Sequence, residues 1–128
     1  MTEVVVVDSS AVLAVLQDEP GAEAARLAMP QSVVSAINYA EVIAKLVERG
    51  DSVDVAEFLM AQLECEVIDV TADRALGAGR IHERTRGRGI SMGDRFCLAL
   101  AEELGLPVVT GDRRWKDLGL PLDVRLIR

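Results

Sequence analysis

The sequence predicts an α/β fold: a three-layer α/β/α sandwich around a short, mostly parallel sheet. Residues 4–7 are consecutive valines, and an uninterrupted β-branched run is typical of a strand that helices cover on both faces. Further along the chain, short apolar strand patterns alternate with longer helical patterns, as parallel βαβ units require. The length of 128 residues suits one core, so we expect residues 1–128 to form a single domain.

The first half of the chain contains two strand patterns and four helical patterns. A helix is expected from Ala11, with Ser9 or Ser10 as its N-cap. A short helix at 22–28 and a short strand at 32–34 follow, and Ser35 can cap a longer helix at 36–49. Helical spacing predicts that the apolar stripe of this longer helix consists of Ile37, Ala40, Ile43 or Ala44, and Val47. The fourth helix is expected at 53–63.

The second half continues the alternation. A capping-box spacing, in which Ser91 precedes Asp94 by three residues, opens an almost wholly apolar helix that closes at Gly105. Such a helix is expected to be buried on more than one face. The remaining expected elements are strands at 65–70 and 106–110, a helix at 72–86 and an edge strand at 124–127.

The composition sets limits on location and partners. Half of the residues are hydrophobic but only 3% are aromatic, so the core must be aliphatic. No apolar run reaches the ~20 residues that span a bilayer, and Asp8 interrupts the apolar stretch near the N-terminus. We therefore expect a cytoplasmic protein with no membrane partner. Cys65 and Cys97 lie in apolar contexts without ligand-like spacing, and we expect them to be core thiols.

The net charge of −7 argues against non-specific binding of nucleic acid, which depends on neutralising phosphates. The objection weakens if several of the carboxylates gather around a metal ion, because the formal charge then overstates the field that a substrate meets. An evenly acidic surface is the simpler explanation of the composition.

Four acidic residues are expected at one edge of the sheet. Asp8 directly follows the first strand and Asp112 follows a later one, and ligands of open α/β sheets bind at the carboxyl ends of the strands. Glu41 and Asp94 lie near the N-termini of helices that begin at the same edge. Each residue alone has an ordinary explanation, since Asp8 and Asp94 suit helix caps and Glu41 suits a solvated face.

Together, these acids predict a metal site. Two carboxylates about 4 Å apart repel each other by about 4 kcal/mol at an effective dielectric constant of 20, and a divalent cation relieves that repulsion. Oxygen ligands without histidine or cysteine favour Mg²⁺ or Mn²⁺ over zinc. Because such ions characteristically activate water against phosphate esters, the expected chemistry is phosphodiester hydrolysis.

The ordered set of motifs resembles the PIN-domain family, and most closely the VapC-type toxins of bacterial toxin–antitoxin systems. The resemblance covers essentially the whole chain and rests on Asp8 with its two following serines, Glu41, Asp94 and the run Thr-Gly-Asp-Arg-Arg-Trp at 110–115. It implies a metal-dependent endoribonuclease that leaves a 5′-phosphate and a 3′-hydroxyl. It also implies a protein that is often a homodimer and is inhibited by a small cognate antitoxin.

The resemblance assigns roles to individual residues. The acidic quartet that binds Mg²⁺ or Mn²⁺ corresponds to Asp8, Glu41, Asp94 and Asp112. Polar positions that support it correspond to Ser9, Asn38 and Thr110. No motif marks the RNA-binding residues; the basic candidates are Arg84, Arg86, Arg88, Arg113, Arg114 and Lys116. Arginines late in a helix equally suit its macrodipole and the surface, and Asp117 suits a surface position.

Three other functions are weighed against this hypothesis. A phosphate-accepting receiver domain would place paired acids after the first strand and a lysine after the fifth, whereas serines follow Asp8 here and both Lys45 and Lys116 lie elsewhere. A haloacid-dehalogenase-like phosphatase needs a second aspartate at position 10, where the chain has Ser10. A PIN fold retained for binding alone is the third alternative.

Overall fold

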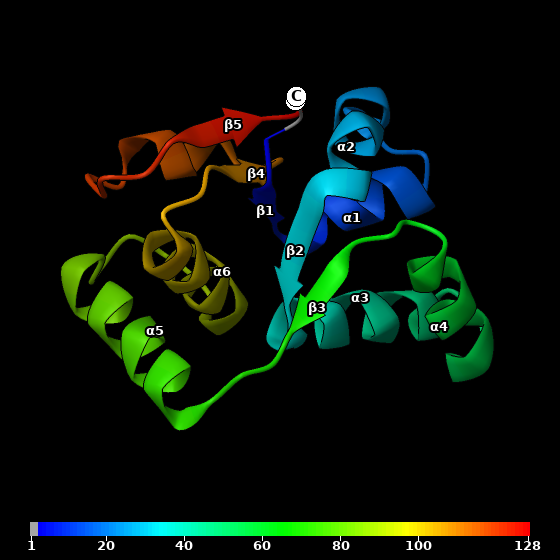
Figure 1. Cartoon of the computed structure of the whole chain (residues 1–128), viewed down its shortest axis with the longest axis horizontal. Helices are drawn as coiled ribbons and strands as arrows, with labels where there is room; N and C mark the ends of the chain where they lie inside the picture. Colours follow the sequence, from blue (N-terminus) through cyan, green and yellow to red (C-terminus); the bar gives the residue numbers. More distant parts are fainter. Residues whose placement is uncertain (1–2) are drawn as a thin grey trace.

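The computed structural model describes residues 3–128 (Figure 1). Eleven helices and strands follow one another along the chain, with two short 3-10 turns. In order, they are β1 (Val5–Val7), α1 (Ser9–Leu16), α2 (Ala22–Ala28), η1 (Met29–Gln31), β2 (Ser32–Ser35), α3 (Ala36–Glu48), α4 (Val53–Ala61), β3 (Glu66–Ile68), α5 (Ala72–Arg84), α6 (Met92–Leu104), β4 (Val108–Thr110), η2 (Arg113–Asp117) and β5 (Val124–Leu126).

The five strands form one sheet in the order β3-β2-β1-β4-β5, and every pair is parallel. The valine-rich β1 is the central strand, with Val6 in register with Val33 on one side and Val108 on the other. The chain winds from β1 through β2 to β3 on one side, and then crosses to β4 and β5 on the other. The order therefore reverses between β1 and β4, the point at which open α/β sheets form a ligand-binding crevice.

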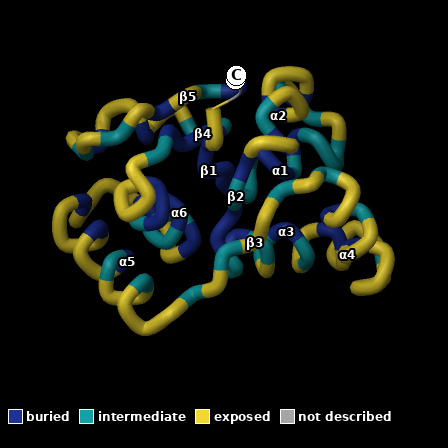
Figure 2. The backbone as a smooth tube through the Cα atoms, viewed as in Figure 1, coloured by how far each residue is buried: buried dark blue, intermediate teal, exposed yellow. Residues whose placement is uncertain are grey.

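Alternate residues of β1 enter two separate cores. Val5 and Val7 pack with buried residues of α1 to α4, such as Val42. Val6 faces the opposite side, where it packs with residues of α5 and α6, such as Ile81 and Leu98. The strands at the centre are buried while the outer faces of α4 and α5 are exposed (Figure 2). The predicted three-layer sandwich is confirmed, and its sheet is wholly parallel.

The N-cap of α1 differs from the prediction. Asp8 caps this helix in an extended conformation, and its Oδ1 accepts a hydrogen bond of 2.9 Å from the Ala11 backbone N–H. The prediction of Ser9 or Ser10 as the cap was wrong, because both serines already lie within the first helical turn. The carboxylate therefore leaves the central strand and caps the following helix at the same time.

The buried face of α3 also differs from the prediction. Asn38, Val42 and Leu46 are the buried residues of this helix, at a spacing of four. Val47, which the predicted stripe included, is 41% exposed. The helix is apolar on more than one side, and its rotation about its axis is fixed by contacts outside it. Among them is the Asn38 side chain, which donates a hydrogen bond to the Gly93 carbonyl of α6.

Two further expectations concern the cysteines and the membrane. Both thiols are free, with Cys97 fully buried and Cys65 half-buried. Within residues 3–128, none of the helices has the length and apolar character needed to cross a bilayer.

Candidate active site

Asp8 is the buried centre of the site, with only 3% of its surface exposed. Its carboxylate accepts hydrogen bonds from three neutral donors: the Thr110 hydroxyl at 2.6 Å, the Ser10 hydroxyl at 2.7 Å and the Ala11 N–H at 2.9 Å. Burial raises the pKa of Asp8 to about 6, although these hydrogen bonds act in the opposite direction. Because the three donors are neutral, none of them balances the charge of the carboxylate, and the setting suits a cation.

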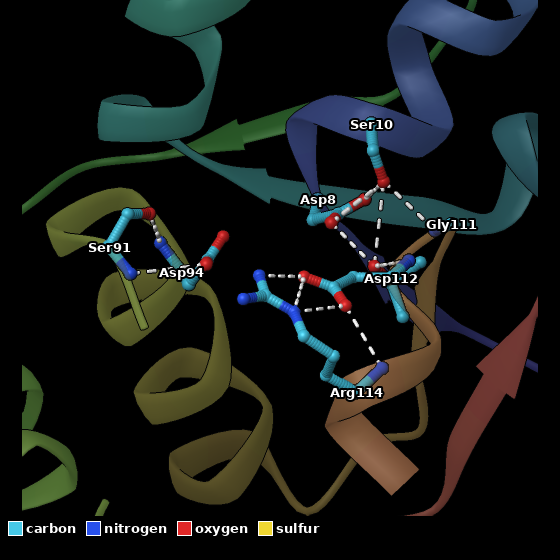
Figure 3. Close-up of polar contacts among 8 residues, drawn as sticks. Asp8, Ser10, Ser91, Asp94, Gly111, Asp112 and Arg114 are labelled. Carbon is cyan, nitrogen blue, oxygen red and sulfur yellow. Dashed lines mark hydrogen bonds and ion pairs between the residues drawn. The ribbon is translucent and has the colours of Figure 1, made fainter. Parts of the chain in front are cut away.

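Two hydroxyls tie the end of β1 to the end of β4. The Gly111 N–H donates to Ser10 Oγ at 2.9 Å, and the Asp112 N–H donates to Thr110 Oγ1 at 3.0 Å. These are the same hydroxyls that donate to Asp8 (Figure 3). Thr110 was predicted as a supporting residue, but Ser10, and not the predicted Ser9, makes the other contacts. The register of the first helical turn decides which serine faces Asp8, and sequence spacing alone does not reveal it.

Asp112 lies just after β4, the strand beside β1, and caps η2. Arg114 binds both of its carboxylate oxygens: Nε donates to Oδ1 at 3.0 Å and Nη2 donates to Oδ2 at 2.6 Å. The Arg114 backbone N–H also donates to Oδ1. The guanidinium holds the pKa of Asp112 below its ordinary value, because it stabilises the charged carboxylate.

Asp94 combines a capping role with a place in the site. It forms the predicted capping box with Ser91, in which each side chain accepts a hydrogen bond of 3.2 Å from the other's backbone N–H. Partial burial raises the pKa of Asp94, and the negative charges of Asp112 and Glu41 raise it further. The ordinary explanation, a helix cap, is correct, and the same carboxylate lies within electrostatic range of the other acids.

Glu41 reaches the site from the second turn of α3. Asn38 donates to Glu41 Oε1 at 2.8 Å and to the Gly93 carbonyl at 3.1 Å, so that it joins α3 to the start of α6. The Glu41 carboxylate occupies the space that a Cβ at Gly93 would fill. Gly93 was not among the predicted site residues, and only its close approach to Glu41 reveals its importance. Asn38 is 1% exposed, and its Oδ1 has no hydrogen-bond partner within residues 3–128.

The four predicted acids therefore come together where the strand order reverses. In Figure 3, the carboxylates of Asp8, Asp94 and Asp112 surround a common space, and the Arg114 guanidinium lies between Asp94 and Asp112. The donors are hard oxygen atoms, the kind of ligand that Mg²⁺ and Mn²⁺ prefer. As the side chains lie, no three His, Cys, Asp or Glu residues in the described part of the chain could hold one ion together.

The six predicted basic residues differ in their contacts. Arg84 forms two hydrogen bonds with Glu102, near the opposite end of α6 from Asp94. Near Asp112, Arg88 donates to the Asp117 carbonyl and Arg113 donates to the Arg128 carbonyl. Three more predicted residues have exposed side chains: Arg86, Arg114 and Lys116. Asp117 is also exposed and, in these contacts, offers its backbone oxygen.

Residues 5–120 match the PIN domain family. The chain belongs to the PIN-domain family. A curated relative from Mycobacterium bovis, named "VapC ribonuclease Mb2780c", is 32% identical over 116 residues, which cover 81% of this chain and 87% of the relative. A Mycobacterium tuberculosis relative named "Ribonuclease VapC42" has the same identity and coverage. The family resemblance deduced from the motifs is confirmed, and the receiver and phosphatase alternatives are set aside.

Several solved structures share the fold. A toxin–antitoxin complex from Klebsiella pneumoniae has a TM-score of 0.78 at 17% identity, covering 97% of this chain and 98% of that chain. DNA-bound VapBC from Salmonella typhimurium has a TM-score of 0.77 at 18% identity, covering 99% and 100%. At these identities the likeness establishes the fold, and the function must be argued from the site.

Proposed function

We propose that this PIN-domain protein is a Mg²⁺- or Mn²⁺-dependent endoribonuclease and the toxin of a toxin–antitoxin pair. The observation that carries the proposal is the convergence of Asp8, Glu41, Asp94 and Asp112 from four separate segments. Relatives that are 32% identical to this chain over 116 residues are named ribonucleases. A site of carboxylates alone, in a chain of this family, is best explained by metal-assisted hydrolysis of phosphodiesters.

The acids divide the chemical roles. Asp8, Asp94 and Asp112 are assigned as ligands of one or two metal ions, and Glu41 as a further ligand or as the base that positions the attacking water. When bound, the metal would neutralise phosphate charge and make water more acidic. The residues of this chain are assigned the remaining task, which is to hold the carboxylates and the substrate in place.

The supporting residues hold two of the four acids. Ser10 and Thr110 fix both oxygens of Asp8, so that this carboxylate is presented in one orientation. Asn38 holds Glu41 Oε1 against the start of α6. As a base, Glu41 would accept a proton from the attacking water at its other oxygen, Oε2. Such positioning lowers the entropic cost of reaching the transition state.

The surroundings of the site support the proposed substrate, and solved structures with the same fold support the proposed partner. Arg88, Arg113, Arg114 and Lys116 lie on or beside η2 and are proposed to hold the RNA backbone. Solved structures with the same fold include toxin–antitoxin complexes, and we propose a small antitoxin as the inhibitor and a homodimer as the assembly. A cytoplasmic location agrees with an RNA substrate and with two free thiols.

Cleavage of a mixed set of structured RNAs with Mg²⁺ or Mn²⁺ tests the proposal, beside an Asp94→Asn control. Metal-dependent cuts that the control lacks are expected, with 5′-phosphate and 3′-hydroxyl ends. No cleavage of any RNA, together with no metal binding in calorimetry, would favour a PIN fold retained for binding alone. Undiminished cleavage by the control would remove Asp94 from the proposed machinery.

A further inference from the structure

Arg114 is bound to Asp112 more completely than an ordinary surface ion pair requires. Its Nε and Nη2 donate to the two carboxylate oxygens, and its backbone N–H donates to Oδ1 as well. The residue thus occupies both oxygens through which Asp112 could bind an ion. Trp115, the next residue along η2, is buried in the core and therefore fixes the backbone of Arg114 beside the site.

Within residues 3–128, Arg114 is also the one basic side chain that forms a salt bridge with any of the four acids. In the described residues, the salt bridges link Asp112 to a basic side chain, and none links Asp8, Glu41 or Asp94 to one. The guanidinium also lies within electrostatic range of Asp94, toward which it points in Figure 3. It therefore lies where the negative charges of two proposed metal ligands meet.

We propose that Arg114 is an internal counter-cation that competes with the divalent metal for Asp112 and, once released, binds the phosphate of the substrate. The inference rests on the proposed metal-dependent function. It assigns Arg114 two alternating partners: Asp112 in the metal-free protein, and RNA in the metal-loaded protein.

The exposure of the pair makes such an exchange feasible. The Arg114 side chain is 61% exposed and that of Asp112 is 23% exposed. Exposed ion pairs contribute little to stability because water screens them, so a divalent cation can displace the guanidinium. A released arginine presents a planar fork of donors that matches phosphate oxygens, and the anchored η2 keeps this fork beside the site.

Calorimetric titration with Mn²⁺ in the absence of RNA measures the competition directly. The proteins compared are the unmodified chain, Arg114→Ala, Arg114→Lys and Arg125→Ala. Arg125, which lies on β5, is a matched control because it forms exposed ion pairs with Glu3 and Asp123. Its loss changes the net charge equally. RNA cleavage at saturating Mn²⁺ is the second measurement.

Arg114→Ala is expected to bind Mn²⁺ about two- to fivefold more tightly, as loss of an exposed competing ion pair predicts, and to cleave RNA more slowly at saturating Mn²⁺. Arg125→Ala should match the unmodified chain in Mn²⁺ affinity, and Arg114→Lys should lie between. Equal or weaker Mn²⁺ binding by Arg114→Ala, or equal tightening in Arg125→Ala, would overturn the inference and leave the proposed function standing. Absence of Mn²⁺ binding by the unmodified chain would overturn both.

Discussion

The two sides of the acidic site hold the same kind of residue in opposite ways. On the closed side, Asp8 is buried and accepts hydrogen bonds from the hydroxyls of Ser10 and Thr110. On the open side, Asp112 is partly exposed and bound by Arg114. Burial raises the pKa of Asp8, whereas the guanidinium lowers that of Asp112. In the proposed metal site, the closed side would therefore provide a fixed ligand that lacks a positive partner, and the open side an adjustable one.

The largest expected difference between the two sides is in RNA cleavage. Asp8→Asn should reduce cleavage about a thousandfold or more, because it removes a proposed metal ligand whose orientation Ser10 and Thr110 fix. Asp112→Asn should cost about ten- to a hundredfold, a loss typical of less central groups at metal sites. Single-turnover rates at saturating Mn²⁺ measure both. Equal losses would show that the open side is as rigid as the closed side.

The two sides should also give opposite pH dependences of stability in the metal-free protein. The pKa of Asp8 rises from 3.8 in the unfolded chain to about 6 in the folded one. Its contribution to the free energy of unfolding is therefore complete below pH 3.8 and is lost as the pH rises through about 6, a decrease of about 3 kcal/mol. The raised pKa of Asp94 acts in the same direction. Asp112, whose pKa is lowered, instead stabilises the fold above the unfolded pKa and loses that effect in more acidic solution.

Urea unfolding in EDTA between pH 4 and pH 7 tests this contrast. The free energy of unfolding should fall as the pH rises, and Asp8→Asn should remove most of that decrease. An Asp8→Asn variant with an unchanged slope would show that another group causes it.

A substitution at Gly93 should disturb the link between α3 and α6. A Cβ there would overlap the Glu41 carboxylate, so Gly93→Ala should displace the proposed base and reduce cleavage about ten- to a hundredfold. Gly79→Ala is a matched control, because a Cβ at this helical glycine has no heavy atom within 4 Å. Cleavage by Gly79→Ala should be unchanged. If Gly93→Ala retained full activity, Glu41 would not need the position that it has here.

The smallest expected effect compares the two serines after Asp8. Ser10→Ala removes a hydroxyl that donates to Asp8 and accepts from Gly111, and it should reduce Mn²⁺ affinity about tenfold. Ser9→Ala, one position earlier in the same helical turn, should change it little. Calorimetry without RNA measures both affinities. The reverse order would return the supporting role to Ser9, the serine predicted for it.

Local sequence patterns were sufficient to predict the fold and the approximate place of the acids. The valine run before Asp8 indicated a buried central strand, and alternation with helices required parallel connections. These two features bring the residues after β1 and β4 to one edge of the sheet, because all parallel strands end on the same side. The capping box of Asp94 was also predictable, since its residues are only three apart.

The tertiary structure alone decided how the side chains meet. The phase of α3, the choice of Ser10 over Ser9, the close approach of Glu41 to Gly93 and the pairing of Arg114 with Asp112 all depend on rotations of helices and side chains about their axes. Apolar periodicity determines that a helix is buried but leaves its rotation open when several faces are apolar. Contacts between segments distant in the chain fix that rotation, and sequence spacing therefore located the acids without showing what holds each one.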